Sequence, residues 1–423
     1  MKITDVKTAL IGHNIVLRIV TDKGIDGYSE FENTKESYID SLIPFFKPLI
    51  MGCDPTDVNG IMWRIRRAGA FKPWGAVVSS IEMACWDIAG KEAGVPVYKL
   101  LGGKVRDKVR VYNGSFKTEA MKAAKKDEND DLRGKAYEND ATPEEVGESM
   151  LALSERPEGF TMAKMAFGWH GGVRFFKKIG LDEFGYNTYY DRPEGTGRGN
   201  IGSLLTERAL NAMIEYVDRL KSVTKDKIGI ALDCGPGMTV PDAKRFAKAV
   251  EPYNLLWIED TIAGDYTPWT MAHAYRDLTT STTTPIHTGE QIYLRENFRE
   301  LIEGQCVNVV GPDPADVGGI AELKWIAEYA DLHGILMAPH GTFDGIFGMA
   351  ALTQVCCTMP NNYIAYEFPA GNPDWWYDIV EGLPENYLRD GHVKVWDKPG
   401  IGVEFNIPKA EKYLLEKDKD FFR

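Results

Sequence analysis

The sequence predicts a (β/α) barrel of seven or eight strands that carries a smaller α+β capping domain built from both ends of the chain. From Val109 onward, short apolar runs alternate with amphipathic stretches, as in proteins whose parallel strands are joined by helices. Three of the runs, KIGIALD, LLWIED and PIHTGE, end in an acidic residue and follow one another about 25 to 30 residues apart. The residues before Val109 lack this alternation.

The composition limits the classes of protein to consider. The 423 residues, 44% of them hydrophobic, suffice for one large barrel and a smaller domain. The 62 acidic residues outnumber the 49 basic ones, and the net charge of −13 argues against binding to nucleic acid or to an anionic membrane surface. The six cysteines are scattered without CxxC spacing, which indicates neither a zinc site nor a disulfide framework.

The chain also carries no signal for membrane insertion or export. Its apolar stretches are shorter than the roughly 20 residues that a membrane span needs, and its start, MKITDVKTAL, does not resemble a signal peptide. We therefore expect a cytoplasmic protein.

Residues 1–108 are expected to form the main part of the capping domain. The segment IVLRIVTDKGIDGYSE predicts a β-hairpin, because two β-rich runs flank a turn sequence that contains glycine. Apolar residues then recur at helical spacing in the segments 42–49 and 81–88. Pro44 and Pro48 weigh against the first of these helices.

Residues 109–370 are expected to form the barrel. Eight runs are candidate strands: VRVYNGSF, FTMAKMAF, KIGIALD, LLWIED, PIHTGE, CVNVVGPD, ILMAPH and YIAYEF. Amphipathic segments at 241–253, 295–304 and 320–334 are candidate helices between them, the last ending at a glycine.

Two inserts and a tail complete the expected organisation. The insert at 120–147 is dense in Lys, Asp and Glu and reads as a solvated excursion. The insert at 168–200 follows the second strand on the catalytic face, where loops shape access to the substrate. Residues 371–423 no longer alternate like a barrel and are expected to pack back against the capping domain.

The three acidic residues Asp233, Glu259 and Glu290 predict a metal site. As the last residues of consecutive barrel strands, their carboxylates would converge on the face that carries barrel active sites. Carboxylates are the hard oxygen ligands that Mg²⁺ prefers. His287, three residues before Glu290, is expected on the opposite face of its strand unless the strand end is irregular.

At the level of motifs the chain resembles the enolase superfamily, in its mandelate racemase-like subgroup. The resemblance spans nearly the whole chain and rests on SSIEMACWDIAGKEAGVPVYKLLGG, ALDCG, WIEDT, HTGEQ, PDPADVGGI, MAPHG and PGIGVEFN. It implies one Mg²⁺ per subunit held by Asp233, Glu259 and Glu290, with His340 as the catalytic base and Asp313 as its partner. It also implies a homo-oligomer.

The implied parts fit one another chemically. A proton next to a carboxylate is very weakly acidic, and a divalent cation stabilises the enediolate that forms when the proton is removed. A histidine base gains the right tautomer and a stabilised imidazolium from a carboxylate partner. Asp313 and His340 are expected to end adjacent strands, so that this pair can form.

One departure from the family pattern indicates the type of reaction. Where the family commonly has a Lys-x-Lys pair, this chain has Lys164 and Ala166, both expected to point into the barrel. Inversion at carbon needs two opposed bases, whereas dehydration can use His340 first as base and then as acid. We therefore expect a dehydratase of an aldonic or aldaric acid that yields a 2-keto-3-deoxy acid, resembling the family's aldonate dehydratases.

Several assignments stay open at this point. Lys164 would neutralise the substrate carboxylate or act as a second acid, and Glu367, His170, Tyr190 and Trp74 are candidate substrate contacts. A racemase, epimerase or cycloisomerase that uses the same enediolate chemistry is the alternative enzyme, and a non-catalytic sugar-acid binder is the alternative of another class. The particular sugar acid is not readable from these residues.

Overall fold

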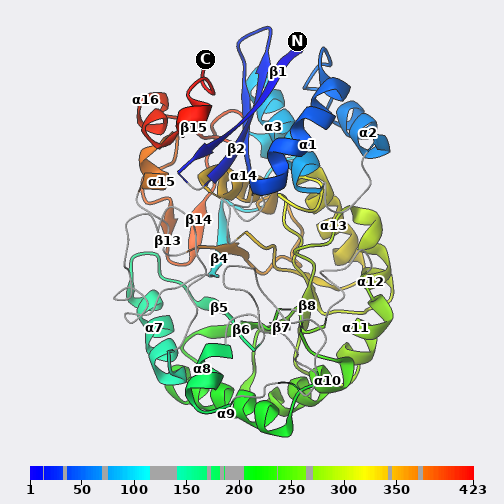
Figure 1. Ribbon diagram of the computed structural model, residues 1–423, viewed down its shortest axis with the longest axis vertical. Helices are drawn as coiled ribbons and strands as arrows, with labels where there is room; N and C mark the ends of the chain where they lie inside the picture. Colours follow the sequence, from blue (N-terminus) through cyan, green and yellow to red (C-terminus); the bar gives the residue numbers. More distant parts are fainter. Residues whose placement is uncertain are drawn as a thin grey trace.

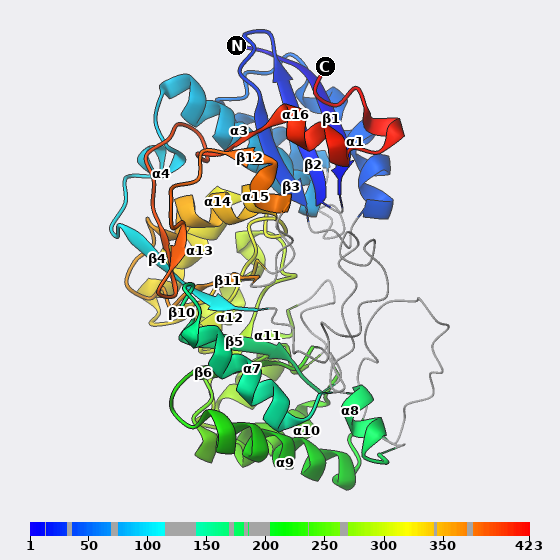
Figure 2. The ribbon, with the colours of Figure 1, turned by 90° about the vertical axis from the view of Figure 1, so that its left-hand side faces the viewer.

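The computed structural model describes most of the chain, and every structural statement below concerns these residues. They are 1–12, 14–31, 36–68, 75–114, 141–168, 173–181, 185, 204–235, 237–262, 270–341, 345–369 and 375–423. Figures 1 and 2 show a domain that contains both ends of the chain, placed on one end of a larger barrel.

The capping domain begins with the predicted hairpin. Three antiparallel strands pair in the order β1-β2-β3 and are followed by four helices. The elements are β1 (Ile3–Ile11), β2 (Asn14–Thr21), β3 (Gly27–Phe31), α1 (Glu36–Ile50), α2 (Val58–Ala68), α3 (Gly75–Ala93) and the short α4 (Val97–Leu100). Helix α1 runs through Pro44 and Pro48, and it buries Ile43, Phe46 and Ile50 in the core of this domain. Packing of this apolar face outweighs the backbone hydrogen bonds that proline removes.

The barrel is a closed ring of eight parallel strands, as expected from the sequence. Strands β4 to β10 pair in chain order, and β11 pairs with β4. A parallel bridge between Met337 and Tyr363 joins β10 to the segment before β11 and closes the ring. The strands are β4 (Lys108–Asn113), β5 (Met162–Ala166), β6 (Gly229–Asp233), β7 (Trp257–Glu259), β8 (Ile286–Thr288), β9 (Val309–Val310), β10 (Leu336–Met337) and β11 (Tyr366–Phe368).

Helices surround the strands on the outside, where Figure 1 shows α7 to α12 as a curved row. They are α7 (Pro143–Glu155), α8 (Val173–Lys178), α9 (Glu207–Thr224), α10 (Val240–Ala249), α11 (Ala272–Thr279), α12 (Arg299–Glu303), α13 (Ile320–Leu332) and α14 (Ile346–Cys356). The side chains of Thr142, Thr206 and Thr239 accept a backbone N–H at the starts of α7, α9 and α10. Such caps satisfy donors that a helix leaves without an internal partner. None of the described helices combines the length and the apolar character that crossing a membrane requires.

The C-terminal segment returns to the capping domain after passing the barrel. Its β14 (His392–Lys394) pairs antiparallel with β4, and its last residues lie along β1. The N–H of Gly12 donates to the carbonyl of Tyr413 at 2.9 Å, and Arg18 Nη1 donates to the carbonyl of Phe421 at 2.6 Å. The remaining elements of this segment are α15 (Trp375–Asp378), β12 (Val380–Glu381), β13 (Leu388–Arg389), β15 (Glu404–Phe405) and α16 (Ile407–Ala410). The domain limits 1–108, 109–370 and 371–423 stay a prediction.

Two buried carboxylates of the capping domain hold the starts of two barrel helices. Glu30 in β3 accepts hydrogen bonds from two backbone N–H groups of α14, at 2.9 and 3.2 Å. Glu82 in α3 accepts two from the start of α13, at 2.7 and 2.9 Å, and a third from the Trp86 indole. Burial raises the pKa of each carboxyl to about 7, despite these hydrogen bonds. The contacts between the two domains are therefore polar as well as apolar.

The buried Glu82 gives a testable pH dependence of stability. Its pKa rises from 4.5 to about 7 on folding, so the native protein keeps a proton that the unfolded chain has released. Stability from this group is complete below pH about 4 and declines as the pH rises through about 7, by about 3 kcal/mol in all. In Glu82→Gln this part of the decline disappears. Urea unfolding at about pH 5 and about pH 8 measures the difference.

A control for this experiment lies in α13, the barrel helix whose start Glu82 binds. Glu328 in α13 has a side chain that is 52% exposed, so Glu328→Gln should keep the pH dependence of the wild-type protein. A Glu82→Gln variant with the same pH dependence as the wild type would contradict the assignment.

Candidate active site

Titratable side chains gather at the carboxyl ends of the barrel strands, the face that carries barrel active sites. Asp233 and Glu259 end the neighbouring strands β6 and β7 and are directly paired in register. Glu290 follows β8, Asp313 follows β9 and His340 follows β10, each within three residues of the strand end. Consecutive strands thus each supply one of the side chains that the sequence singled out.

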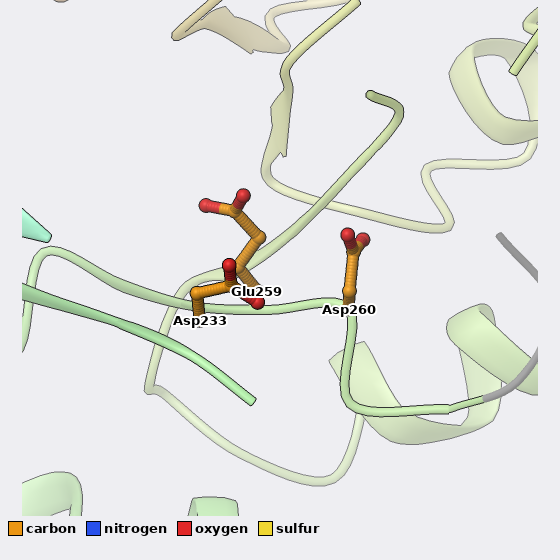
Figure 3. Close-up of side chains that lie close together, drawn as sticks. All are labelled: Asp233, Glu259 and Asp260. Carbon is orange, nitrogen blue, oxygen red and sulfur yellow. The ribbon is translucent and has the colours of Figure 1, made fainter. Parts of the chain in front are cut away.

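Three carboxylates form a cluster that suits a cation. Oxygens of Asp233, Glu259 and Asp260 lie within 4.8 Å of one another (Figure 3). Such hard oxygen donors fit Mg²⁺. Glu290, which the sequence favoured as the third ligand, lies outside this cluster, and its Oε2 is 3.2 Å from His340 Nε2.

Asp260 was not singled out from the sequence, because strict alternation would place it on the opposite face from Glu259. In the structure Asp260 has a left-handed backbone with φ 48°, which breaks the alternation at the strand end. Its Oδ1 accepts a hydrogen bond from Thr288 Oγ1 at 2.7 Å. The feature of the sequence that could have indicated Asp260 is the pair of acidic residues at the end of LLWIED.

His340 and Asp313 are in contact. The His340 Nδ1–H donates to Asp313 Oδ2 at 2.6 Å, and the N–H of Ala315 donates to the other carboxylate oxygen at 2.7 Å. The imidazole therefore presents Nε2 to its surroundings, 3.2 Å from Glu290 and 3.6 Å from Glu367. Burial lowers the pKa of His340, but the charges of Glu290 and Glu367 and the bond to Asp313 outweigh it and raise the pKa well above its ordinary value.

Lys164 lies inside the barrel between two carboxylates. Its Nζ is 2.5 Å from Glu259 Oε1 and 3.2 Å from Glu367 Oε2, and all three side chains are buried. Burial alone lowers the pKa of Lys164, but the charges of Glu259 and Glu367 raise it well above the ordinary value. The two carboxylates thus favour the ammonium form of Lys164. Ala166 is exposed and is paired with Asp233 in register, at the end of β5.

Two aromatic side chains support the carboxylates from within the barrel. The Trp257 Nε1–H donates to Glu259 Oε2 at 2.8 Å, and the Tyr112 hydroxyl donates to Glu367 Oε2 at 3.3 Å. The two rings meet edge to face, with centroids 5.3 Å apart. Neither residue stood out in the sequence, because a buried aromatic side chain in a strand is ordinarily part of the core.

His287 lies inside the barrel, because the strand end is irregular, which was the exception to its expected position on the opposite face. His287 is paired with Glu259 in register, so both side chains point to the same face, and its ring stacks on Trp257 with centroids 5.2 Å apart. Gly289, with φ 134°, then breaks the alternation before Glu290. Burial lowers the pKa of His287 to about 3 and raises that of Glu259 to about 8, in the latter case despite the charge of Lys164.

Of the four predicted substrate contacts, only Glu367 lies among the residues that the structure describes. Glu367 lies in β11 within hydrogen-bonding distance of Tyr112 and next to Lys164. His170, Tyr190 and Trp74 lie outside the described residues.

These features define a barrel whose strand ends carry a carboxylate cluster of the kind that suits a cation, with a buried His–Asp pair beside it. The chain belongs to the mandelate racemase/muconate lactonizing enzyme family of the enolase superfamily, which confirms the resemblance seen in the sequence. The model of the enolase C-terminal domain-like family matches residues 149–410. That of the mandelate racemase / muconate lactonizing enzyme N-terminal domain matches residues 2–102.

Individual relatives extend over the whole chain. A D-xylonate dehydratase from Haloferax volcanii is 30% identical over 433 residues, covering 99% of this chain and 90% of that protein. A D-galactonate dehydratase from Ralstonia pickettii is 26% identical over 430 residues, covering 99% and 95%. The crystal structure of a mandelate racemase/muconate lactonizing enzyme-like protein from Rubrobacter xylanophilus has a TM-score of 0.74 and 29% identity, covering 98% and 97%.

The buried ion contacts of Lys164 predict a large effect on stability. Lys164→Met leaves Glu259 and Glu367 buried without their shared cation, which should lower the free energy of unfolding by roughly 3 kcal/mol or more. Chemical unfolding without added divalent cation measures this loss. Lys248→Met is the control, because Lys248 has a side chain that is 67% exposed. Wild-type stability in Lys164→Met would show that the two carboxylates do not depend on the ammonium group.

Proposed function

We propose that the protein is a Mg²⁺-dependent dehydratase of a sugar acid, and that it converts an aldonate or aldarate into a 2-keto-3-deoxy acid. The observation that carries the proposal is the single oriented base: His340 is held by Asp313 at 2.6 Å, while Ala166 occupies the position of a second base. Relatives named D-xylonate dehydratase and D-galactonate dehydratase support the reaction type. Their identities of 30% and 26% leave the particular sugar acid open.

The carboxylate cluster would hold the cation. Asp233 and Glu259 would be two of the ligands, with Glu290 at the next strand end as the third. When bound, Mg²⁺ supplies positive charge that stabilises the negative oxygens of the substrate carboxylate as the α-proton leaves.

His340 would carry out both proton transfers. Its Nδ1–H is engaged by Asp313, so Nε2 in its neutral form takes the proton from C2 of the substrate. The C2–H electron pair is delocalised into the carboxylate and then forms a double bond to C3 as the C3–O bond breaks. The imidazolium gives the same proton to the departing hydroxyl, which leaves as water. The resulting enol becomes the 2-keto-3-deoxy acid.

The neighbouring side chains would bind the substrate. Lys164 adds a fixed positive charge near the substrate carboxylate, and Glu367 is positioned to accept a hydrogen bond from a substrate hydroxyl. Substrate contacts by His170, Tyr190 and Trp74 are part of the same proposal, as is a homo-oligomeric state inferred from the family.

A screen of substrates tests the reaction. Purified protein with Mg²⁺ is incubated with a library of aldonic and aldaric acids, and formation of 2-keto acids is measured. At least one acid should be dehydrated, and His340→Asn should lower kcat roughly 10²- to 10⁴-fold or more, because the base is lost. Glu259→Gln should also be strongly impaired. Full activity of His340→Asn would contradict the mechanism.

A racemase, epimerase or cycloisomerase is the second candidate, since Lys164 lies inside the same barrel as His340. Its ammonium group is held by two carboxylates, and its pKa is raised by their charges despite burial, which disfavours Lys164 as a base. Formation of a C2 epimer without loss of water would favour this candidate instead.

The identity of the third cation ligand can be tested directly. Glu290 is 7% exposed, whereas Asp260 is 1% exposed and already accepts a hydrogen bond from Thr288. Glu290→Gln should therefore weaken Mg²⁺ binding at least about tenfold, and Asp260→Asn should weaken it less. Calorimetric titration of each variant with MgCl₂ provides the comparison. The opposite order would make Asp260 the third ligand.

A further inference from the structure

The indole of Trp257 is bonded to the carboxylate of Glu259 inside the barrel. The two residues are two positions apart in β7, so their side chains point to the same face of the strand. Trp257 is 1% exposed, and its Nε1–H donates to Glu259 Oε2 at 2.8 Å. This hydrogen bond connects the core of the barrel with the carboxylate cluster at the strand ends.

Neighbouring rings restrict the orientation of the indole. Tyr112 meets it edge to face, with centroids 5.3 Å apart and planes at 78°, and His287 stacks on it at 5.2 Å and 21°. The same buried cluster contains three alanines whose small side chains leave space for the indole: Ala231, Ala338 and Ala365. The direction of the Trp257 N–H is therefore set by packing.

The Glu259 carboxylate receives a donor on each of its oxygens. Lys164 Nζ lies 2.5 Å from Oε1, and the Trp257 N–H lies on Oε2. The last torsion of a glutamate side chain has a broad energy minimum, so the plane of the carboxylate is set by its contacts. Two donors on different oxygens fix this plane, and each oxygen keeps a further lone pair for a cation.

A buried tryptophan is ordinarily part of a core, and its N–H ordinarily has a partner. Trp86 in α3 is such a case, because its Nε1–H donates to Glu82 Oε1 at 2.7 Å in the contact between the two domains. The acceptor of Trp257 differs in its place. Glu259 belongs to the cluster of three carboxylates whose oxygens lie within 4.8 Å of one another.

We propose that Trp257 is a positioning residue that sets the orientation of the Glu259 carboxylate for cation binding. The inference rests on the proposed function in taking Glu259 as a ligand of the cation. The indole nitrogen is a donor only, so Trp257 acts on the cation through Glu259 and not as a ligand itself. Removal of a residue that orients a metal ligand typically changes metal affinity or activity by roughly 10- to 100-fold.

Two substitutions separate the N–H group from the volume of the ring. Trp257→Phe keeps an aromatic ring but loses the donor. Trp257→His also has a smaller ring, but histidine Nε2 stands at the same position of the five-membered ring, counted from Cγ, as tryptophan Nε1. Trp86→Phe is the matched control, because it removes the same kind of indole–carboxylate hydrogen bond in the contact between the two domains.

The main measurement is calorimetric titration of each folded variant with MgCl₂, which requires no substrate. We expect Trp257→Phe to bind Mg²⁺ roughly 10- to 100-fold more weakly, Trp257→His to recover part of this loss, and Trp86→Phe to bind like the wild type. Urea unfolding should show a lower midpoint for both phenylalanine variants, because each leaves a buried carboxylate without one donor. A purely structural role of Trp257 would lower the midpoint without changing the Mg²⁺ affinity.

Three results would overturn the proposal. They are wild-type Mg²⁺ affinity in Trp257→Phe, an equal loss of affinity in Trp257→Phe and Trp257→His, and a similar loss in Trp86→Phe. If Trp257→Phe does not fold, site-specific incorporation of benzothienylalanine at position 257 replaces it, since sulfur takes the place of the N–H in a ring of nearly the same shape. Wild-type affinity in that protein would likewise overturn the proposal.

The same titrations distinguish this inference from the proposed function. Weak Mg²⁺ binding in Trp257→Phe, together with a wild type that binds Mg²⁺ but dehydrates no sugar acid, would keep the positioning role and reject the dehydratase. Dehydratase activity in a wild type whose Mg²⁺ affinity is unchanged by Trp257→Phe would reject the positioning role alone. A wild type that binds no Mg²⁺ would overturn both.

Discussion

The ammonium group of Lys164, buried between the carboxylates of Glu259 and Glu367, is the interaction around which the rest of the site is arranged. A charge removed from water is tolerated only when it is closely paired, and here the two strands β7 and β11 supply the partners. Trp257 and Tyr112 add hydrogen bonds to the same two carboxylates. These contacts orient Glu259 and Glu367, and Asp233, Glu290 and His340 lie at the neighbouring strand ends.

At the contact between the two domains, buried carboxylates are likewise paired with hydrogen-bond donors. Glu30 and Glu82 belong to the capping domain, and their carboxylates accept hydrogen bonds from backbone N–H groups at the starts of barrel helices α14 and α13. Each carboxyl satisfies donors that a helix start would otherwise bury without partners. Helix α14 begins shortly after His340, so one of these contacts lies close in sequence to the proposed base. The capping domain thus helps to fix the barrel end that carries the site.

Much of this arrangement could be predicted from the sequence, because strand ends leave a strong pattern. A run of apolar residues that closes with Asp233, Glu259 or His340 marks both the strand and the direction of its last side chain. Alternation failed where the backbone leaves the regular strand, at Asp260 with φ 48° and at Gly289 with φ 134°. Because Gly289 breaks the alternation between His287 and Glu290, both side chains can face the barrel interior, and this irregularity is not readable from the sequence.

The central claim is that His340 is the group that removes the α-proton. The most direct test uses a sugar acid that the wild-type protein dehydrates. It is incubated in D₂O with the wild type or with His340→Asn, and proton NMR follows the substrate and the product. The account predicts that the wild type forms the 2-keto-3-deoxy acid, whereas His340→Asn neither forms it nor introduces deuterium at C2 of the recovered substrate. Deuterium at C2 in the presence of His340→Asn would show that another group takes the proton and would contradict the account.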